Sequence, residues 1–362
     1  MKILRRDNPE KKISDETLDI LKPYMVQFGD HELAYSLLQR GMEYFILEDV
    51  GVVGFRSIGR KPLVLGDPLA DKKDYERIMS VFFDNFKNAS FIQAHKDFST
   101  CLHDNHGFYA NEMGVSTELS IPHYNLVGEA KQKIRTGINK AKKEGVTIRE
   151  VSLDNLKGLE FLVDEYISTK TVKNEISFLA REFLTEDEWE VRKFVAEKDG
   201  RVVGLAVYSP MFSDGRIIGY LSDILRTSPE APPGLSYAMN MHALRTFKED
   251  REKSQEAKVS GGETTKYTHL SKFSLGLSPF ANIKDEDNTN NPLTTLILTG
   301  MHEFGNSLYN TKGLARNKYY YYGEEQPTFY CSKSKLCVVD LLSVYKACNI
   351  SVAKQVTGAF TR

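Results

Sequence analysis

The sequence has few of the residues that mark several common protein classes. Its 362 residues include only four cysteines and one tryptophan. The cysteines have no Cys-x-x-Cys spacing, so the sequence predicts neither a zinc knuckle nor a disulfide framework. We expect reduced thiols at Cys101, Cys331, Cys337 and Cys348. Cys101, His103 and His106 lie close together in the sequence, but no further ligand cluster completes a metal site. We interpret that segment as a polar loop, and no metal is predicted.

Long apolar runs and a net charge are also missing. The longest apolar stretches, such as the one around 296–298, fall far short of the roughly 18 residues that span a bilayer. The formal net charge is −1, so any contact with RNA needs a local basic patch. The charged start of the chain has no apolar segment typical of a secretion signal. We therefore expect a cytoplasmic protein that reaches a membrane only peripherally, from its inner face.

Three motifs of common enzyme classes do not occur. Gly-x-Ser-x-Gly is absent, which removes the commonest serine-hydrolase elbow. Neither the Gly-x-x-x-x-Gly-Lys-Ser/Thr loop that holds nucleotide phosphates nor the dinucleotide pattern Gly-x-Gly-x-x-Gly is present. ATP and nicotinamide cofactors are therefore not predicted.

The chain contains two successive α+β units of the same design. Each unit contains helices and antiparallel strands, and in each a strand ends in a Leu-Gly turn, at 65–68 and again at 275–279. The alternative is that this short echo arises by chance. The composition, 41% apolar and 27% charged, is that of a globular protein. We predict an α+β fold of two tandem acyltransferase-like lobes, residues 1–150 and 151–362, each with a largely antiparallel mixed sheet flanked by helices. The active site is expected in the second lobe.

Local patterns give the expected elements. In the first half we expect a helix at 15–21 that stops near Pro23, three antiparallel strands, and an amphipathic helix with an aromatic face at 71–88. In the second half, Asp199-Gly200 and Asp214-Gly215 predict hairpin turns. The expected strands are 44–47, 50–55, 63–65, 91–94, 108–112, 118–121, 194–197, 202–208, 217–221 and 273–275. Further helices are expected at 129–144, 153–170, 234–248 and from 293, with a polar loop at 249–268.

Asp223 and Arg226 are the residues best suited to chemistry. They follow a predicted strand and precede a Pro-rich turn, a position from which both side chains would point into a cleft. An aspartate there can accept a proton from a hydroxyl group, and an arginine can hold a phosphate or carboxylate through two hydrogen bonds. The alternative is a surface ion pair of no functional consequence.

Two further segments combine basic residues with aromatic ones or with a helix. The helix at 129–144 carries Lys133, Arg135, Asn139 and Lys140, and is either a solvated face or a patch for RNA phosphates or anionic lipid. The second segment contains Lys312 and Lys318 followed by tyrosines 319–322, which could stack on a terminal base or form a strand at a rim. Gly276 and Ser278 lie in a turn that has either a purely structural role or a place in the pocket.

The order of five segments resembles one family. LVLGDP, KIRTGINKAKKEG, SDILR, SLGLSPF and YNTKGLARNK follow one another as in the DUF2156 family, the soluble C-terminal domain of bacterial phosphatidylglycerol lysyltransferases. The resemblance implies two GNAT-like lobes, an active site at Asp223 and Arg226, and substrate contacts from Lys133, Arg135, Asn139, Lys140, Lys312 and Lys318. Gly276 and Ser278 are further candidates for substrate contact, from their place in the SLGLSPF turn. Thr311 departs from the family, which has an aromatic residue there.

The resemblance implies an acyltransferase that moves an aminoacyl group from aminoacyl-tRNA to a lipid or other small acceptor, with no cofactor. The first alternative is an acyl-CoA-dependent N-acyltransferase. The Arg/Gln-x-x-Gly-x-Gly/Ala loop that cradles the CoA pyrophosphate in ordinary N-acetyltransferases is expected to be absent from both halves, which counts against it. The second alternative is a noncatalytic domain that binds lipid or tRNA. The sequence predicts neither the amino acid nor the oligomeric state.

Overall fold

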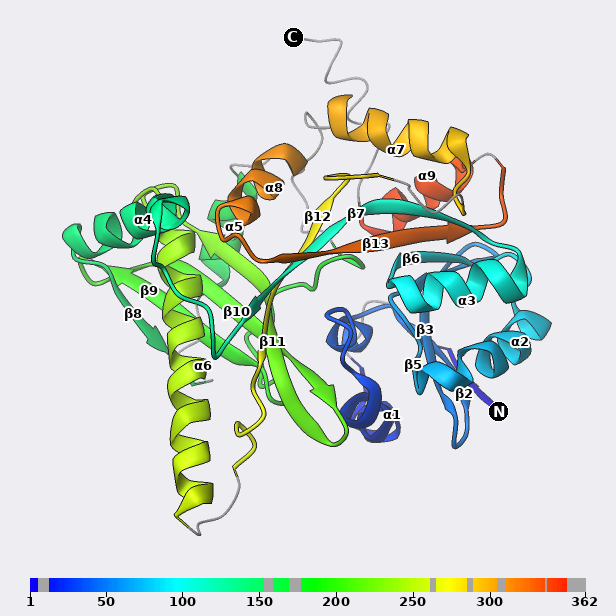
Figure 1. Cartoon of the computed structure of the whole chain (residues 1–362), viewed down its shortest axis with the longest axis horizontal. Helices are drawn as coiled ribbons and strands as arrows, with labels where there is room; N and C mark the ends of the chain where they lie inside the picture. Colours follow the sequence, from blue (N-terminus) through cyan, green and yellow to red (C-terminus); the bar gives the residue numbers. More distant parts are fainter. Residues whose placement is uncertain are drawn as a thin grey trace.

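A single mixed sheet runs through the whole molecule (Figure 1). The computed structural model describes residues 1–5, 13–152, 159–168, 177–260, 265–284, 289–304, 310–335 and 337–349. In these residues the strands have the spatial order β1-β2-β3-β4-β6-β13-β7-β12-β11-β10-β9-β8, and β5 pairs with β3. Only β4–β6 and β11–β12 are parallel pairs. The predicted α+β class, with a mixed sheet flanked by helices, is confirmed.

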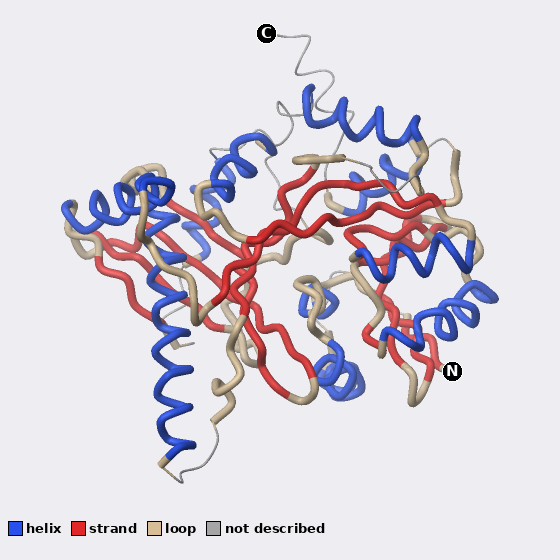
Figure 2. Tube along the Cα trace, in the orientation of Figure 1, coloured by secondary structure: helices blue, strands red, loops and turns tan. Residues whose placement is uncertain are grey.

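The sheet has three parts along its length. The first contains β1 (Lys2–Leu4), β2 (Glu43–Leu47), β3 (Gly51–Ile58), β4 (Lys61–Leu65), β5 (Leu69–Ala70) and β6 (Ser90–Ala94). The middle contains β13 (Glu324–Ser332), β7 (Tyr109–Ser120) and β12 (Lys272–Pro279). The last contains β11 (Arg216–Thr227), β10 (Arg201–Ser213), β9 (Arg192–Lys198) and β8 (Thr147–Glu150). Figure 2 shows the strands as one continuous band.

The middle strands join the two halves of the sequence. β7 belongs to the first half, yet both of its neighbours, β12 and β13, come from the second. β13 in turn pairs with β6 of the first half. The predicted boundary near residue 150 stays a prediction, since the backbone hydrogen bonds of the sheet continue across it.

The helices are α1 (Asp15–Phe28), α2 (Tyr75–Asn85), α3 (Lys96–His106), α4 (Gln132–Lys143), α5 (Glu160–Ser168), α6 (Leu235–Val259), α7 (Pro292–Phe304), α8 (Thr311–Tyr319) and α9 (Val338–Ala347). The expected aromatic face of α2 is buried, with Phe82 in edge contact with Phe45 and Phe55. Among the described residues, no helix has both the length and the apolar character to cross a membrane.

Four expectations about these elements were wrong. α1 does not stop at Pro23 but continues to Phe28, because Leu21 and Met25, one turn apart, are both buried and hold it against the core. The segment with Cys101, His103 and His106 is helix α3 rather than a loop. α6 continues through the expected polar loop to Val259. The two strands expected at 108–112 and 118–121 are one strand, β7.

Two glycines allow α4 to approach the start of α6 closely. Gly234, just before α6, has φ +91°, and a Cβ built on it would lie 2.6 Å from the Cα of Gly137 in α4. A Cβ on Gly137 would lie 3.0 Å from the Tyr237 ring. The basic helix is therefore fixed against α6 by backbone contact, with Ile134 and Ala141 buried beside it.

We expect Gly234→Ala to destabilise the protein more than Gly200→Ala. Both glycines have positive φ, but a Cβ on Gly200 would meet nothing within 4 Å. Both changes should cost about 1–2 kcal/mol for the left-handed backbone. Gly234→Ala should cost about 1–3 kcal/mol more, because the methyl group forces the two helices apart. Urea denaturation measures both values. Equal losses would mean that the close approach of the helices does not matter.

Candidate functional site

Asp223 is the extra residue of a β-bulge in β11. Val207 of β10 pairs with Ile224, and the next residue, Tyr208, pairs with Ser222, so that Asp223 has no partner of its own. A bulge re-aims the side chain of the extra residue. The Asp223 carboxylate is buried, with 4% of its side chain exposed. Its Oδ2 accepts hydrogen bonds from Arg181 Nε at 2.7 Å and Ser209 Oγ at 2.6 Å.

Arg181 connects Asp223 to a second carboxylate. Its Nη1 donates to Glu188 Oε1, and Lys193 Nζ lies 2.8 Å from Glu188 Oε2. Burial acts to raise the pKa of Glu188, but Arg181 and Lys193 hold it below its usual value. Two cations and two carboxylates thus balance one another in the interior. We refer to Arg181, Glu188, Lys193 and Asp223 as the Arg181 cluster.

Arg226, the second predicted catalytic residue, has other partners. Its guanidinium lies 4.6 Å from the centre of the Tyr166 ring in α5, and its Nη1 donates to the carbonyl of Leu225 at 3.2 Å. Asp223 and Arg226 therefore share a strand but bind different groups. The catalytic role assigned to each stays a prediction.

Lys318, near the end of α8, is buried against the bulged strand β12. Its Nζ donates to the carbonyl oxygen of Leu277 at 2.7 Å. Gly276 has φ +71°, and a Cβ there would lie 3.2 Å from Leu221 Cδ1 and at an ordinary contact distance of 3.7 Å from Lys318 Nζ. Burial lowers the pKa of the Lys318 amine to about 7, and the negative charge of Glu32 opposes that shift. At pH above about 7 this lysine is therefore a neutral amine in the interior.

Ser278 and the peptide group of Gly276 also lie at this strand. Ser278 is 3% exposed. The N–H of Gly276 donates to Ser274 Oγ at 3.0 Å, so it is already engaged within the strand. Lys312 lies one and a half turns before Lys318 on α8 and is partly exposed.

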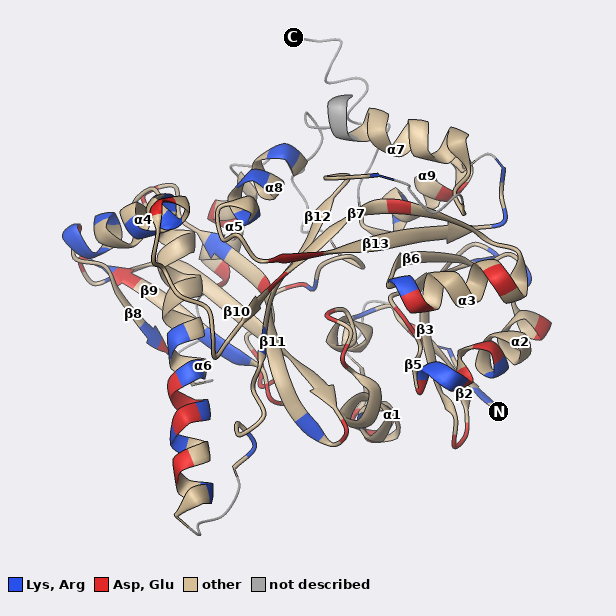
Figure 3. Ribbon diagram, in the orientation of Figure 1, with Lys and Arg blue, Asp and Glu red and all other residues tan. Residues whose placement is uncertain are grey.

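Lysines and arginines lie along α4 and α8 (Figure 3). Basic side chains from this region approach aromatic rings. Lys131 Nζ lies 4.1 Å from the centre of the Tyr124 ring and 5.6 Å from that of Tyr322. Lys133 Nζ lies 6.0 Å from the centre of the Tyr320 ring. Arg316 Nε donates to the Tyr320 hydroxyl at 3.2 Å. The tyrosine-rich segment is a helix end and turn rather than a strand. We call these residues (Tyr124, Lys131, Lys133, Arg316, Tyr320 and Tyr322) the α4–α8 surface.

The other predicted residues of α4 fall into two groups. Arg135 holds the preceding loop, because its Nη1 donates to the carbonyl groups of Leu126 at 2.5 Å and Gly128 at 2.6 Å. Asn139 and Lys140 are exposed. Lys133 and Lys140 are thus the predicted residues of α4 whose charges face solvent.

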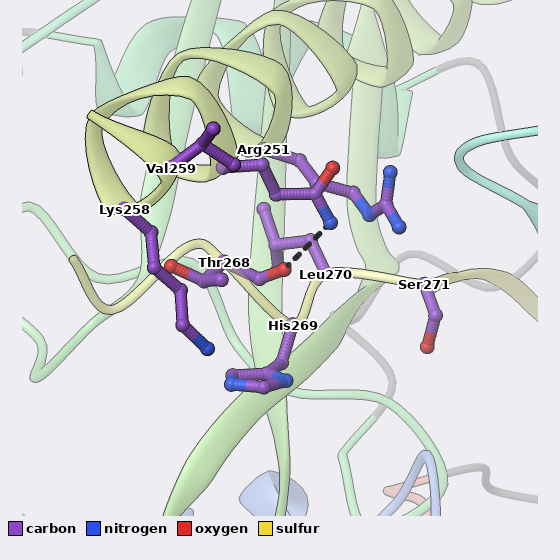
Figure 4. Close-up of a pocket in the computed structure, with 8 residues that line it drawn as sticks. Arg251, Lys258, Val259, Thr268, His269, Leu270 and Ser271 are labelled. Carbon is purple, nitrogen blue, oxygen red and sulfur yellow. Dashed lines mark hydrogen bonds between the residues drawn. The ribbon is translucent and has the colours of Figure 1, made fainter. Parts of the chain in front are cut away.

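A separate pocket of about 460 Å³ lies between the end of α6 and residues 268–271 (Figure 4). Arg251, Lys258 and His269 are among its lining residues, and Gln255 closes one side through a hydrogen bond to the carbonyl of Thr268. None of the predicted site residues lines it.

Sequence reasoning missed most of these partners. Glu188, Lys193 and Ser209 carry no motif and come from three separate segments. One CoA-loop expectation also needs correction, because Arg201-Val202-Val203-Gly204-Leu205-Ala206 has the letters of that pattern. These residues lie inside strand β10 and not in a loop before a helix, so they cannot cradle a pyrophosphate in that way.

Comparisons with known proteins identify a family model and relatives that match this chain. The family model described as "Phosphatidylglycerol lysyltransferase, C-terminal" matches residues 23–332. A phosphatidylglycerol lysyltransferase of Bacillus subtilis is 22% identical over 252 residues, 66% of this chain. An uncharacterised protein of Corynebacterium glutamicum is 24% identical over 216 residues, 56% of this chain. The aligned regions are 26% and 27% of the lengths of these two relatives.

Two solved structures have the same fold. The L-PGS of Bacillus licheniformis superposes with a TM-score of 0.69 at 17% identity, covering 94% of this chain and 99% of that one. The C-terminal DUF2156 domain of a putative lysylphosphatidylglycerol synthetase from Agrobacterium fabrum gives 0.68 at 16% identity, covering 90% and 96%.

We expect Arg181→Met to be far more destabilising than Arg149→Met. Arg181 is buried, and its removal leaves two carboxylates with one cation, a change that costs about 3–5 kcal/mol. Arg149 pairs with Glu197 at the surface, where 49% of its side chain is exposed, and such pairs contribute only about 0–1 kcal/mol. The free energy of unfolding in urea separates the two. Similar small losses would show that the Arg181 cluster is hydrated.

Proposed function

The chain belongs to the family of phosphatidylglycerol lysyltransferase C-terminal domains, and on that premise we propose that it is an aminoacyltransferase. The proposed donor is an aminoacyl-tRNA, and the proposed acceptor is a hydroxyl group of a lipid such as phosphatidylglycerol. The B. subtilis relative is named for transfer to that lipid, which supports the acceptor. The activity would take place where the protein meets the inner surface of the membrane.

The α4–α8 surface is the observation that supports aminoacyl-tRNA as the donor. Amino groups on aromatic rings and a cluster of neighbouring tyrosines suit a single-stranded nucleic acid end, where phosphates bind cations and bases stack on rings. Tyr319 lies 5.1 Å from Tyr322 between ring centres. Arg316 on this surface and the buried Lys318 are two residues apart on α8. The same short helix thus leads from the surface to the buried amine.

Ester exchange requires positioning and proton transfer, and neither ATP nor a metal takes part in it. In our proposal the neutral Lys318 amine accepts the proton of the acceptor hydroxyl. The hydroxyl oxygen then attacks the aminoacyl carbonyl carbon, and the bond to the ribose oxygen breaks. The ribose oxygen receives the proton back. Arg226 would hold a phosphate of the lipid.

Asp223 has a different task in this scheme. Its Oδ2 already accepts two hydrogen bonds, from Arg181 and Ser209, which fix the position of the carboxylate. It suits the role of orienting the acceptor hydroxyl, or the ammonium of the aminoacyl group, from a fixed position. Lys318, whose pKa burial lowers to about 7, is better matched to proton transfer near neutral pH.

Transfer of radiolabel from charged tRNA to lipid tests the proposal. Purified protein, a pool of tRNAs charged with labelled amino acids, and vesicles containing phosphatidylglycerol should give label in the organic phase. Asp223→Asn should lower the rate by at least tenfold. Asp340→Asn is the matched control, since Asp340 is also a buried carboxylate, bound to Ser332 at 2.8 Å, but lies outside the proposed site.

The same assay distinguishes the alternatives. No label from any charged tRNA, together with acyl transfer from CoA esters, would contradict the proposal and favour an acyl-CoA-dependent enzyme. Tight binding of tRNA or lipid without transfer from any donor would contradict catalysis altogether. Equal loss of activity in Asp223→Asn and Asp340→Asn would mean that the loss comes from impaired folding.

The rate of transfer should rise with pH through about 7 and then level off. Lys318 is lowered to a pKa of about 7 by burial, so its base form is present above that pH and is lost below it. Lys318→Met should lower the rate by roughly 10²–10⁴-fold, the usual contribution of a general base, and remove this step from the profile. Lys335→Met, at an exposed position, should change neither. An unchanged pH profile in Lys318→Met would exclude Lys318 as the base.

A further inference from the structure

Two histidines and a glutamate from separate segments meet inside the first half of the sheet. His31 and Glu32 follow α1, and His95 lies between β6 and α3. One ligand atom of each lies within 4.8 Å of the other two. His31 is 3% and Glu32 6% exposed. None of them belongs to the site around Asp223, and the scheme above gives them no role.

Both ring nitrogens of each histidine have polar partners, and one nitrogen of each also lies near the carboxylate of Glu32. Leu33 N–H donates to His31 Nδ1, so Nε2 carries the proton and donates to the carbonyl of Gln93 at 2.9 Å. His95 Nδ1 lies 3.2 Å from Asp67 Oδ2. Metal-binding histidines usually have this arrangement, with the second N–H bound to a backbone carbonyl or a carboxylate.

The backbone around the cluster is held in conformations that ordinary residues avoid. Gln93 has φ +60°, and in this conformation its carbonyl meets His31 while its side-chain Nε2 donates to Glu32 Oε1 at 2.9 Å. Gly66 has φ +68°, and a Cβ there would lie only 3.1 Å from His31 Cε1. Strain of this kind is typical of functional sites. The Gly66-Asp67-Pro68 turn thus gives room to one histidine and binds the other.

The charges of the cluster favour a divalent cation. His95 lies between two carboxylates, with Nε2 3.1 Å from Glu32 Oε2 and Nδ1 3.2 Å from Asp67 Oδ2. Glu32 and Asp67 thus bring two carboxylates into one largely buried place. A divalent ion bound at Glu32 would offset their negative charge, which lowers the cost of burying it.

We propose that His31 Nδ1, Glu32 Oε2 and His95 Nε2 bind a divalent transition-metal ion, with Zn²⁺ as the best match. Two imidazoles and one carboxylate form a common three-ligand zinc set that leaves a fourth position for water. Glu32 Oε2 lies 4.0 Å from His31 Nδ1 and 3.1 Å from His95 Nε2, close to the ~3.4 Å between ligands of a tetrahedral ion with bonds of ~2.0–2.1 Å.

Binding requires a small, defined rearrangement. His95 Nε2 releases its proton to solvent, and His31 Nδ1 exchanges the Leu33 N–H for the ion. The two rings, stacked with their centres 3.9 Å apart, must open so that both nitrogens point at one centre. His95 is 32% exposed, which provides a route of entry. The ion would fasten the segment after α1 to β6 and to the Gly66 turn.

The test is the metal content and affinity of the full chain. Protein treated with a chelator and then given one equivalent of Zn²⁺ should retain about one ion per chain after gel filtration. His95→Gln and Glu32→Gln should lose it. Asp67→Asn, which touches the ion only through His95, should weaken binding by about 10–100-fold. His103→Gln on α3 is the matched control and should bind as the wild type does.

A measurement on the wild type alone guards against variants that do not fold. Co²⁺ should give the intense visible absorption of a tetrahedral site, and each ion bound should release protons to an indicator. Retention of no Zn²⁺ at 100 µM free metal would overturn the proposal and identify the cluster as an ion-paired network. Binding that persists in His95→Gln would overturn it as well.

Discussion

The backbone hydrogen bonds of β7 hold this molecule together. A central strand must satisfy its N–H and C=O groups on both edges, and β7 finds both partners, β12 and β13, in the second half of the chain. β13 also completes the first half by pairing with β6. Each half of the chain therefore needs a strand from the other half to complete the sheet. The helix α8, which carries Lys318, lies between these two strands in the chain and is positioned by both of them.

Irregularities in the strands set the chemistry of the site. A regular strand alternates its side chains between two faces, which would place Asp223 by parity alone. The bulge between Ser222 and Ile224 breaks that alternation and directs Asp223 to Arg181. A second irregularity, between Ser274 and Gly276 of β12, lies where Gly276 has a positive φ and where the Lys318 amine donates to the carbonyl of Leu277. The continuous sheet thus brings the segments together, and local shifts in strand register orient the side chains of the site.

Buried charges in this protein lie in groups that contain both signs. These groups determine which segments must meet more than they stabilise the fold. In the Arg181 cluster two cations match two carboxylates. Arg192, buried beneath α6, is a different case, since it binds two partly exposed carboxylates, Glu150 and Asp250, at 2.6 Å each. Because an unmatched buried charge costs several kcal/mol, each group specifies which segments must meet. Lys318 differs, since burial lowers its pKa to about 7 in spite of Glu32.

The sequence predicts elements whose signal is local. The strands β2 to β4 and the helices α2 and α4 have clear apolar patterns. Gly200 and Gly215 mark the turns that join β9, β10 and β11. α3 was missed because most of its residues are polar and only Phe98, Ser99 and Leu102 are buried. β13 was missed because its pairing with β6 and β7 joins distant segments. The candidate site divides in the same way: the family pattern indicates Asp223, Arg226 and Lys318, but Glu188, Lys193 and Ser209 carry no pattern.

Glu32 lies in the first half of the chain, yet it affects Lys318, which lies in the second half together with the predicted catalytic residues. Its carboxylate bonds to Gln93 and His95 of the first half and to Ser116 of β7. It is also the charge that acts on Lys318 across the middle strands. A change at Glu32 therefore alters both its hydrogen-bonded partners and Lys318, because the interior contains little solvent to screen its charge. The two halves are therefore coupled through charge as well as through the sheet, and a fragment containing only the second half would lack β7, Glu32 and the environment that makes Lys318 a neutral amine.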